Sequence, residues 1–571
     1  MKTFIKSLTT IFIWHLYLVP AIAQDVSEAS AYLSKNVKDV SIKDVLYKQS
    51  FSEEGSECIY EVSITDTKKD QENRYLFNAA DLNEYKVSFS TQKNAVVISV
   101  ETKGGKSLIR HRRDNSVSGY VKSFSLNADD VEAARGIVDQ LRALVKACEK
   151  HQENIGFVLG ENADYAKALN FLDDNIVNIT INEKALDQKF SQNASFANLV
   201  SIEVNDVAKA IVIKKEFNVA DINVTTIGFD TKQEHVLISG TTKGKRKLVR
   251  TYKNGELGNY EDGFTFYAES VEKARKLVEV LQYMANESEK VQSAELKNIA
   301  TMSELSQLNG FLEKNLKDAA FGSQNYKQSI SYNNENANLV TFTIENVNKG
   351  ETYAYFLNLA DINETALSFD TRSNEVVINV PIVGKRSLVQ THKNGEQVNF
   401  QNEVTMWAND IEEARHLVDA LQKAVDISKK KQEKNFIDGN PSPSQEQALK
   451  FVEEQLGEVV IGVDAYKQKF KPNMENQCLA SIEVEDVSKG VIMEYKFNLK
   501  DINQHQVIFD TKKNEVFISL ETKGSKNKVI ETIKNGASDS FTDKFTFLAK
   551  DVEEARKLEL AFRLLAANCD K

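Results

Sequence analysis

The feature that most constrains this chain is a phrase of seven residues that occurs four times at a constant spacing. It reads FNAADLN at Phe77–Asn83, FNVADIN at Phe217–Asn223, LNLADIN at Leu357–Asn363 and FNLKDIN at Phe497–Asn503. The aspartate of each copy lies 140 residues after the previous one. Solenoid repeats are far shorter, because each must stack on its neighbours to bury a core. A unit of this length can bury a core of its own, so the phrase predicts four tandem domains.

The same register extends well beyond the phrase and sets the domain boundaries. VEAAR at Val131, VEKAR at Val271 and IEEAR at Ile411 keep the period, and VEEAR at Val552 is displaced by one inserted residue. Polar segments separate the copies. We predict that the repeats cover residues 25–150, 163–288, 304–428 and 445–571.

The first residues of the chain have the pattern of an export signal. Lys2 and Lys6 precede an apolar stretch from Leu8 to Val19, and small residues follow at Ala21–Ala23. This pattern predicts a signal peptide at residues 1–23, cleaved after Ala23, and a protein exported to the periplasm or the cell exterior. An N-terminal membrane anchor is the alternative, but the apolar stretch is short. No other stretch approaches the length of a membrane-spanning helix, so the mature chain is expected to lack one.

Each repeat is predicted to have an α+β fold. In the fourth copy, Gln445–Leu456 has apolar residues at helical spacing, and strand-like runs separated by turn signals follow it. In the first copy, an apolar stripe at 3-4 spacing runs from Val131 to Cys148 and predicts a closing helix. The pattern is an N-terminal helix, about seven antiparallel strands and a C-terminal helix laid against them.

This order of elements resembles the pleckstrin-homology-like (PH-like) barrel. The closing stretch FYAESVEKARKLVEVLQ at Phe266–Gln282 is the part of the sequence most similar to that fold. The resemblance implies seven strands whose last one runs into a helix that caps one end of a barrel. It covers each repeat except the N-terminal helix. Another fold with a helix on a sheet of the same strand number is the alternative.

The repeat register selects one pairing of the four cysteines. Cys58 and Cys478 are 420 residues apart, which is three periods, and Cys148 and Cys569 are equivalent once the inserted residue is counted. The middle repeats lack both cysteines and have Asn198 with Ser288, and Asn338 with Ser428, at these positions. Because both cysteines are present or both absent, we predict disulfides Cys58–Cys148 and Cys478–Cys569. They are typical of an oxidising compartment.

No catalytic motif emerges from the sequence. Apart from His15, which falls in the predicted signal, no two histidines share a position in the repeat. The motifs HExxH, GxSxG and CxxC and a phosphate-binding glycine loop are absent. We therefore expect a non-enzymatic protein without cofactor or metal, and a hydrolase with an unrecognised carboxylate site is the alternative.

Calcium binding is the sharpest functional alternative for the recurring phrase. Asn78, Asp81 and Asn83 are oxygen donors at short spacing, as at the start of a calcium loop. The glycine and the glutamate that complete such a loop are missing. We therefore expect these residues to end a strand and to bond to the backbone of the next turn.

Lysines and arginines recur in one hairpin of each repeat. This hairpin includes Lys245, Arg246, Lys385 and Arg386, which are candidate contacts for an acidic partner. The loops that bind phosphoinositides in PH-like domains are acidic or neutral here, so that function does not carry over. The net charge of −11 also argues against nucleic-acid binding.

The sequence as a whole is interpreted as an exported scaffold or binding module. Four tandem copies provide avidity without new chemistry. We expect an elongated monomer that binds a protein partner or another envelope component. The alternative is a binder of an anionic glycan or lipid headgroup through the basic hairpins.

Overall fold

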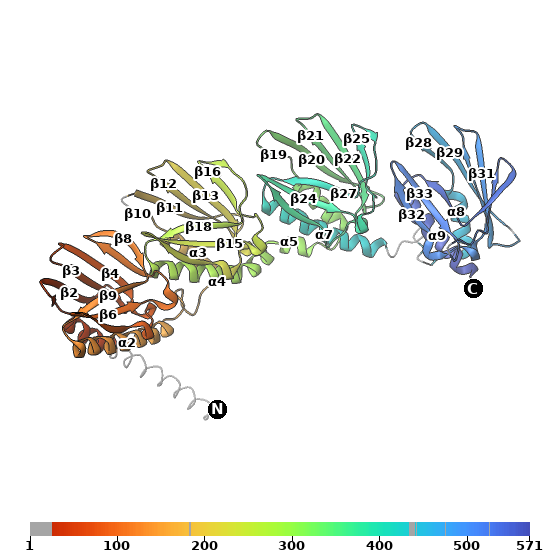
Figure 1. Cartoon of the computed structure of the whole chain (residues 1–571). Coiled ribbons are helices and arrows are strands. Elements are labelled where there is room, and N and C mark those ends of the chain that lie inside the picture. The colour runs from red at the N-terminus through yellow and green to blue at the C-terminus, as the bar shows by residue number, and fades with distance from the viewer. Residues whose placement is uncertain are drawn as a thin grey trace, which may run out of the picture. The chain divides into compact units, whose positions relative to one another are not determined.

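The computed structural model of the chain describes residues 26–181, 184–432, 440, 442–473, 475–524 and 526–570. The predicted signal peptide, residues 1–23, lies outside the described residues. The chain divides into two compact units between Glu295 and Leu296. The first unit contains repeats 1 and 2, and the second contains repeats 3 and 4 (Figure 1).

Within the described residues, the strands of each repeat form one six-stranded and one three-stranded antiparallel sheet. In repeat 1 the six-stranded order is β1-β2-β3-β4-β7-β8, and β5-β6-β9 form the smaller sheet. The strands of repeat 1 are β1 Val40–Ile42, β2 Val45–Glu53, β3 Ile59–Asp66, β4 Gln71–Asn78, β5 Ser88–Gln92, β6 Ala95–Glu101, β7 Ile109–Arg113, β8 Ser116–Val121 and β9 Ser123–Ala128. Those of repeat 2 are β10 Ile179–Ile181, β11 Lys184–Gln192, β12 Leu199–Asp206, β13 Ile211–Asn218, β14 Gly228–Lys232, β15 His235–Thr241, β16 Arg250–Lys253, β17 Glu256–Leu257 and β18 Gly263–Ala268.

The second unit repeats this topology in both of its halves. The strands of repeat 3 are β19 Ala319–Phe321, β20 Gln324–Tyr332, β21 Leu339–Asn346, β22 Glu351–Asn358, β23 Ser368–Arg372, β24 Glu375–Pro381, β25 Gln390–Lys393, β26 Glu396–Gln397 and β27 Glu403–Ala408. Those of repeat 4 are β28 Glu458–Ile461, β29 Asp464–Pro472, β30 Leu479–Asp486, β31 Val491–Asn498, β32 Ile508–Lys512, β33 Glu515–Glu521, β34 Ile530–Lys534, β35 Ala537–Thr542 and β36 Lys544–Ala549.

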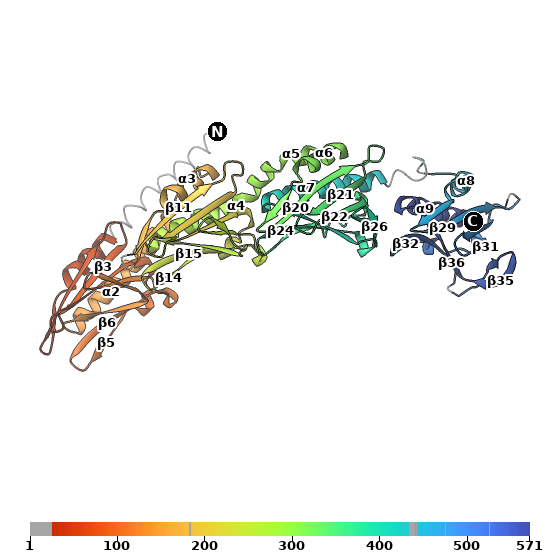
Figure 2. The same cartoon turned by 90° about the horizontal axis from the view of Figure 1, so that it is seen from above.

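A long helix closes each repeat and packs against the smaller sheet. These helices are α2 Val131–Asn154, α4 Val271–Glu295, α7 Ile411–Gln432 and α9 Val552–Cys569. The predicted apolar stripe of α2 is buried from Ala134 to Cys148, so this prediction is confirmed. A shorter helix precedes the strands of each repeat: residues 26–36, α3 Tyr165–Asn175, α6 Leu305–Asn315 and α8 Gln445–Gln455. Figure 2 shows α3 beside β11, and α5 Lys297–Thr301 is an additional short helix before α6.

One buried glutamine per repeat joins the two sheets. In repeat 3 the side-chain Nε2 of Gln328 donates to the carbonyl of Trp407 at 2.9 Å, and its Oε1 accepts from the amide of Trp407 at 2.8 Å. Gln328 lies in the larger sheet and Trp407 in the smaller one. Gln49, Gln188 and Gln468 make the same pair of bonds in the other repeats. On this side, the backbone of Trp407 has no neighbouring strand of the smaller sheet within the described residues. The glutamine side chain therefore supplies its hydrogen-bond partners.

Both predicted cysteine pairings are confirmed. Cys58–Cys148 has an S–S distance of 2.09 Å and Cys478–Cys569 one of 2.08 Å. In the middle repeats, hydrogen bonds occupy the same place. Asn198 Nδ2 donates to the carbonyl of Ser288 at 2.7 Å, and Ser428 Oγ donates to Asn338 Oδ1 at 3.3 Å. All four repeats thus link the start of their third strand to the closing helix, two covalently and two by polar contacts.

The α+β class and the fourfold repetition are confirmed, whereas a PH-like barrel is not. The two sheets of a repeat do not close into one barrel within the described residues. Repeat 1 has nine strands instead of about seven, because the sequence reading did not resolve short ones such as Val40–Ile42. None of the described helices is long and apolar enough to cross a membrane.

Candidate functional site: the junction between repeats

The recurring phrase forms the end of the fourth strand of each repeat and two turns that follow it. Asn78 Oδ1 accepts a hydrogen bond from the amide of Ala80 at 2.9 Å, and Asn83 Oδ1 accepts one from Tyr85 at 3.1 Å. These bonds cap short 3-10 turns, as expected for asparagine at a strand end. The two asparagines therefore have the local role that the sequence predicted. The aspartate between them does not.

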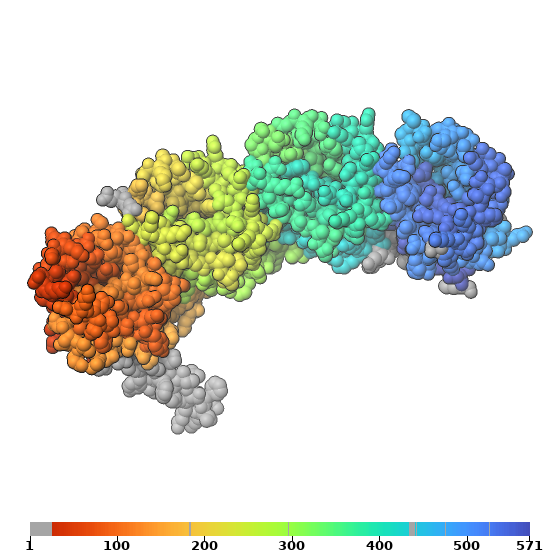
Figure 3. All heavy atoms as spheres, viewed as in Figure 1, coloured from red at the N-terminus to blue at the C-terminus, as the bar shows by residue number. Residues whose placement is uncertain are grey.

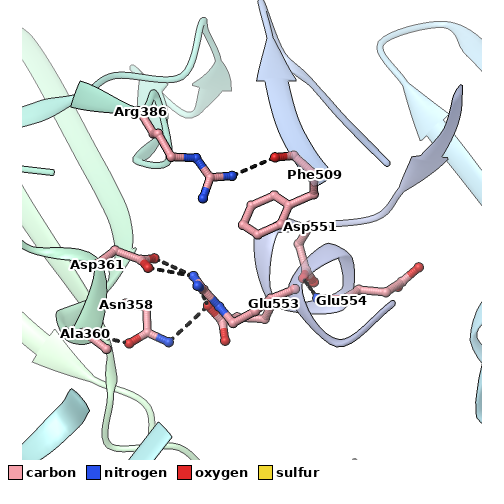
Figure 4. Close-up of polar contacts among 9 residues, drawn as sticks. Asn358, Ala360, Asp361, Arg386, Phe509, Asp551, Glu553 and Glu554 are labelled. Carbon is pink, nitrogen blue, oxygen red and sulfur yellow. Dashed lines mark hydrogen bonds and ion pairs between the residues drawn. The ribbon is translucent and has the colours of Figure 1, made fainter. Parts of the chain in front are cut away.

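The aspartate of the phrase forms an ion pair with the following repeat. In the second unit, Arg556 Nη2 lies 2.8 Å from Asp361 Oδ1 and 2.6 Å from Oδ2 (Figure 4). Asp361 is only 8% exposed, and it belongs to repeat 3, whereas Arg556 lies in the first turns of α9 in repeat 4. Asn358 Nδ2 also donates to Glu553 Oε1 at 3.0 Å, so the phrase binds the start of α9 twice.

The first unit contains the same ion pair between repeats 1 and 2. Arg275 Nη2 lies 2.6 Å and 2.7 Å from the two carboxylate oxygens of Asp81. Asp81 and Asp361 are two periods apart, and Arg275 and Arg556 hold the same place in the VEKAR and VEEAR motifs. The pair is therefore a property of the repeat and not of one junction.

Backbone contacts accompany the ion pair in both units. The amide of Tyr120 donates to the carbonyl of Gln233 at 2.8 Å, and the amide of Phe400 donates to the carbonyl of Lys513 at 2.9 Å. Gly119 has a φ of +127°, and a Cβ there would lie 2.8 Å from the Gln233 carbonyl oxygen, so only glycine fits this approach. In Figure 3 the atoms of repeats 1 and 2 meet directly, as do those of repeats 3 and 4.

A threonine hydroxyl contributes to both junctions, and the second unit adds an aromatic contact. Thr231 Oγ1 donates to the carbonyl of Ser107, and Thr511 Oγ1 to that of Ser387. In the second unit, Arg386 Nη2 donates to the Phe509 carbonyl at 2.6 Å, and its guanidinium lies 4.3 Å from the Phe509 ring centroid (Figure 4). Such stacking suits the planar guanidinium of arginine.

Burial dominates the electrostatics of these carboxylates. Burial raises the pKa of Asp361, and the attraction of Arg556 opposes that rise. Burial also raises the pKa of Asp81 and of Glu272, which lies near the same arginine in the first unit. Because a buried charge without a partner is costly, each junction depends on both members of its ion pair.

The predicted ligand contacts differ in their surroundings. Lys245 and Lys385 are exposed, with φ angles of 54° and 58° beside the glycines of their turns. Arg386 contacts repeat 4, as described above, and Arg246 also has a polar or ring contact within the protein. Lys245 and Arg246 lie in repeat 2, and Lys385 and Arg386 lie in repeat 3. The four residues remain predicted contacts.

Aromatic residues line a cleft in repeat 3. It has a volume of about 520 Å³ and lies between the two sheets. The rings of Tyr326 and Trp407 stack with centroids 3.9 Å apart, and those of Tyr353 and Tyr355 are 6.1 Å apart. At the matching positions, repeat 2 has one aromatic residue, Tyr267. Repeat 1 has two, Tyr47 and Tyr75, and repeat 4 has two, Tyr466 and Tyr495. Repeat 3 alone concentrates four.

The carboxylates of the two described junctions already have partners. Among the described residues, no three His, Cys, Asp or Glu side chains lie close enough to hold a metal ion. The carboxylates of Asp81 and Asp361 are engaged by arginines. This arrangement holds the surfaces of two neighbouring repeats together.

The sequence did not lead us to predict the ion pair, although both of its residues belong to recurring motifs. Aspartate recurs in every copy of the phrase, and arginine recurs in every copy of the closing-helix motif. Two recurrent residues of opposite charge in a tandem array are a signal of contact between neighbouring copies. Comparisons of the chain with protein-family models, curated proteins and solved structures found no match.

Proposed function

We propose that this chain is an exported, non-enzymatic scaffold that binds a protein partner through the aromatic cleft of repeat 3. The observation that carries the proposal is the concentration of Tyr326, Tyr353, Tyr355 and Trp407 in one cleft. Tyrosine and tryptophan are enriched where proteins bind partners, because they bury much apolar area and retain a polar atom. The recurrent polar residues, in contrast, join the repeats to one another.

The paired repeats support a scaffold role. Each described junction combines an ion pair with a backbone hydrogen bond, and the second unit adds a ring contact, so neighbouring repeats are held by several elements at once. We interpret each repeat as a PH-like unit whose two sheets stay open at one side. The disulfides accord with an oxidising compartment, and export by a signal peptide cleaved after Ala23 to the periplasm or cell exterior is part of this proposal.

The test is a capture experiment with a cleft variant and a matched control. Immobilised protein is incubated with native envelope material, and the bound proteins and glycans are identified. Tyr353→Ala removes one ring of the cleft, and Tyr85→Ala removes a ring that is 83% exposed in repeat 1. We expect Y85A and the unmodified chain to retain the same protein, and we expect Y353A to bind it at least about tenfold more weakly.

Three results would contradict the proposal. Equal capture by Y353A and Y85A would show that the cleft is not the binding surface. Capture of an anionic glycan, lost in a Lys245→Glu, Lys385→Glu double variant, would favour the basic hairpins instead. Turnover of a bound component that one carboxylate substitution abolishes would favour a hydrolase. Thermal unfolding of each variant establishes that it is folded.

A further inference from the structure

The last repeat presents the surface that the other repeats use to bind a neighbour. We define the tail face of a repeat as the surface around its phrase aspartate and the aromatic residue in or just after its eighth strand, such as Asp361 and Phe400. The head face is the surface around the closing-helix arginine, such as Arg556. In both units a tail face binds the head face of the following repeat.

In repeat 4 the tail face is open. It forms a concavity of about 560 Å³ that is lined by residues of repeat 4 alone, including Asn498, Asp501 and Phe541. The matching cavity of repeat 3 measures about 390 Å³, and Asp551, Val552 and Glu553 of repeat 4 line part of it. The following repeat thus fills part of this space in repeat 3, whereas only its own residues line the space in repeat 4.

Apolar residues that a neighbour covers in repeat 3 are exposed in repeat 4. Phe400 is 7% exposed and Leu388 4%, whereas their counterparts Phe541 and Val529 are 56% and 39% exposed. In repeat 1 the counterparts Tyr120 and Leu108 pack against the core of repeat 2. An exposed aromatic residue beside other apolar residues in a concavity is characteristic of a protein-binding surface.

The charged residues of the two terminal faces are complementary. In the described part of the chain, the carboxylate of Asp501 forms no ion pair, although it matches Asp81 and Asp361. At the other end, Arg135 matches Arg275 and Arg556, and its side chain is 55% exposed against 28% and 17% for theirs. Arg135 contacts Glu132 of its own helix, as Arg556 contacts Glu553. Within the described residues, repeat 4 thus has an unoccupied tail face and repeat 1 has the matching head-face arginine.

We propose that the tail face of repeat 4 binds the head face of repeat 1 of a second copy of this chain. The contact would repeat the two described junctions, with Asp501 against Arg135 and Phe541 against the start of the smaller sheet. A contact between two different faces leaves one further face free on each chain, so it allows chains to join head to tail into a ring or an open filament. This inference replaces the expectation of a monomer from the sequence, and it is independent of the cleft in repeat 3.

The expected affinity follows from the covalent link between repeats. A short linker gives neighbouring repeats an effective concentration in the millimolar range. A junction that is closed under those conditions needs a dissociation constant at or below about 1 mM. Separate chains should therefore associate measurably between tens of micromolar and about 1 mM, which sets the concentration range of the experiment.

The test is sedimentation of purified chains that carry one blocked face each. Phe541→Asp blocks the tail face, and Arg135→Glu blocks the head face. Val463→Asp is the matched control, because it also replaces an exposed apolar residue of repeat 4 by aspartate, and Val463 is 96% exposed and does not line the concavity. We expect concentration-dependent oligomers for the unmodified chain and for V463D. The association constant of each blocked variant alone should fall at least about tenfold.

A mixture of the two blocked variants gives the most specific test of the contact. F541D retains its head face and R135E its tail face, so an equimolar mixture should form a dimer of one copy of each that cannot grow. Asp501→Asn provides a milder tail-face variant if F541D does not fold. A chain that stays monomeric up to about 1 mM would overturn the proposal, as would oligomers that form equally well with both faces blocked. A mixture without dimers would also overturn it.

Discussion

Equivalent residues contribute unequally to stability when only one of them contacts another repeat. Asp361 and Asp501 occupy the same position of the repeat, but within the described residues only Asp361 forms an ion pair with another repeat. Asp361→Asn should lower the free energy of unfolding of the second unit by about 1–3 kcal/mol, because Arg556 would lose its charged partner in a largely buried place. Chemical denaturation checks this value, and hydrogen exchange should show lost protection at the start of α9.

Repeat 4 provides the control for the Asp361→Asn variant. Asp501→Asn makes the same chemical change in repeat 4, where no ion pair is broken, and should leave the unfolding of dilute protein nearly unchanged. Equal destabilisation by both substitutions would mean that the aspartate acts within its own repeat. The ion pair between repeats would then contribute little.

A histidine in repeat 1 makes stability depend on pH. His111 is 8% exposed, and its Nε2 lies 2.9 Å from Asn73 Oδ1. Burial lowers the pKa of His111, and the nearby Arg113 adds to this effect. As the pH falls below the ordinary value of 6.5, the unfolded chain takes up a proton that the folded chain does not. Stability is therefore lost as the pH falls from 6.5 toward the folded pKa.

His111→Gln removes this dependence and keeps a polar side chain beside Asn73. The difference in free energy of unfolding between the original chain and H111Q should fall between pH 7 and pH 5, by at most about 1.4 kcal/mol per pH unit. Denaturant titrations at several pH values measure it. The buried carboxylates with raised pKa values act in the opposite direction in both proteins and cancel in the difference. A constant difference would contradict the prediction.

At the scale of elements, one position of the repeat accepts either a disulfide or a hydrogen bond. The third strand is tied to the closing helix by Cys58–Cys148 in repeat 1 and by Asn198 with Ser288 in repeat 2. Cys58 has a φ of 73°, a region that asparagine tolerates better than most residues. A C58N/C148S variant therefore places the residues of repeat 2 at these positions, and asparagine can adopt the φ of Cys58.

The expected result is a graded loss of stability. Removing the disulfide should cost about 2–4 kcal/mol in the free energy of unfolding of repeat 1. C58N/C148S should retain part of this, about 1 kcal/mol, relative to C58A/C148A, because the new asparagine can donate a hydrogen bond to the helix. Calorimetry of the three proteins compares them. Identical melting of the two double variants would show that the hydrogen bond of the middle repeats does not substitute for the bridge.

At the scale of the whole molecule, the sequence predicted the features that recur within each repeat, but it did not predict the contacts between repeats. Periodicity gave the number of repeats, the closing helices and, with the cysteines, both disulfides, because each depends on local pattern or on register. The smaller sheet was not foreseen, since β15 pairs with β18, with two strands between them in the sequence. The role of Asp81 depends on Arg275, 194 residues away, and no local pattern reports such a contact.

The junction also determines how this protein can change in length. Every repeat has a head face and a tail face of the same design, so removing repeats 2 and 3 in register would place Asp81 of repeat 1 opposite Arg556 of repeat 4. Insertion of a further pair would likewise bring matching faces together. Unequal recombination within the gene can therefore lengthen or shorten the chain by whole repeats, and each product keeps compatible neighbours and disulfide-bonded ends.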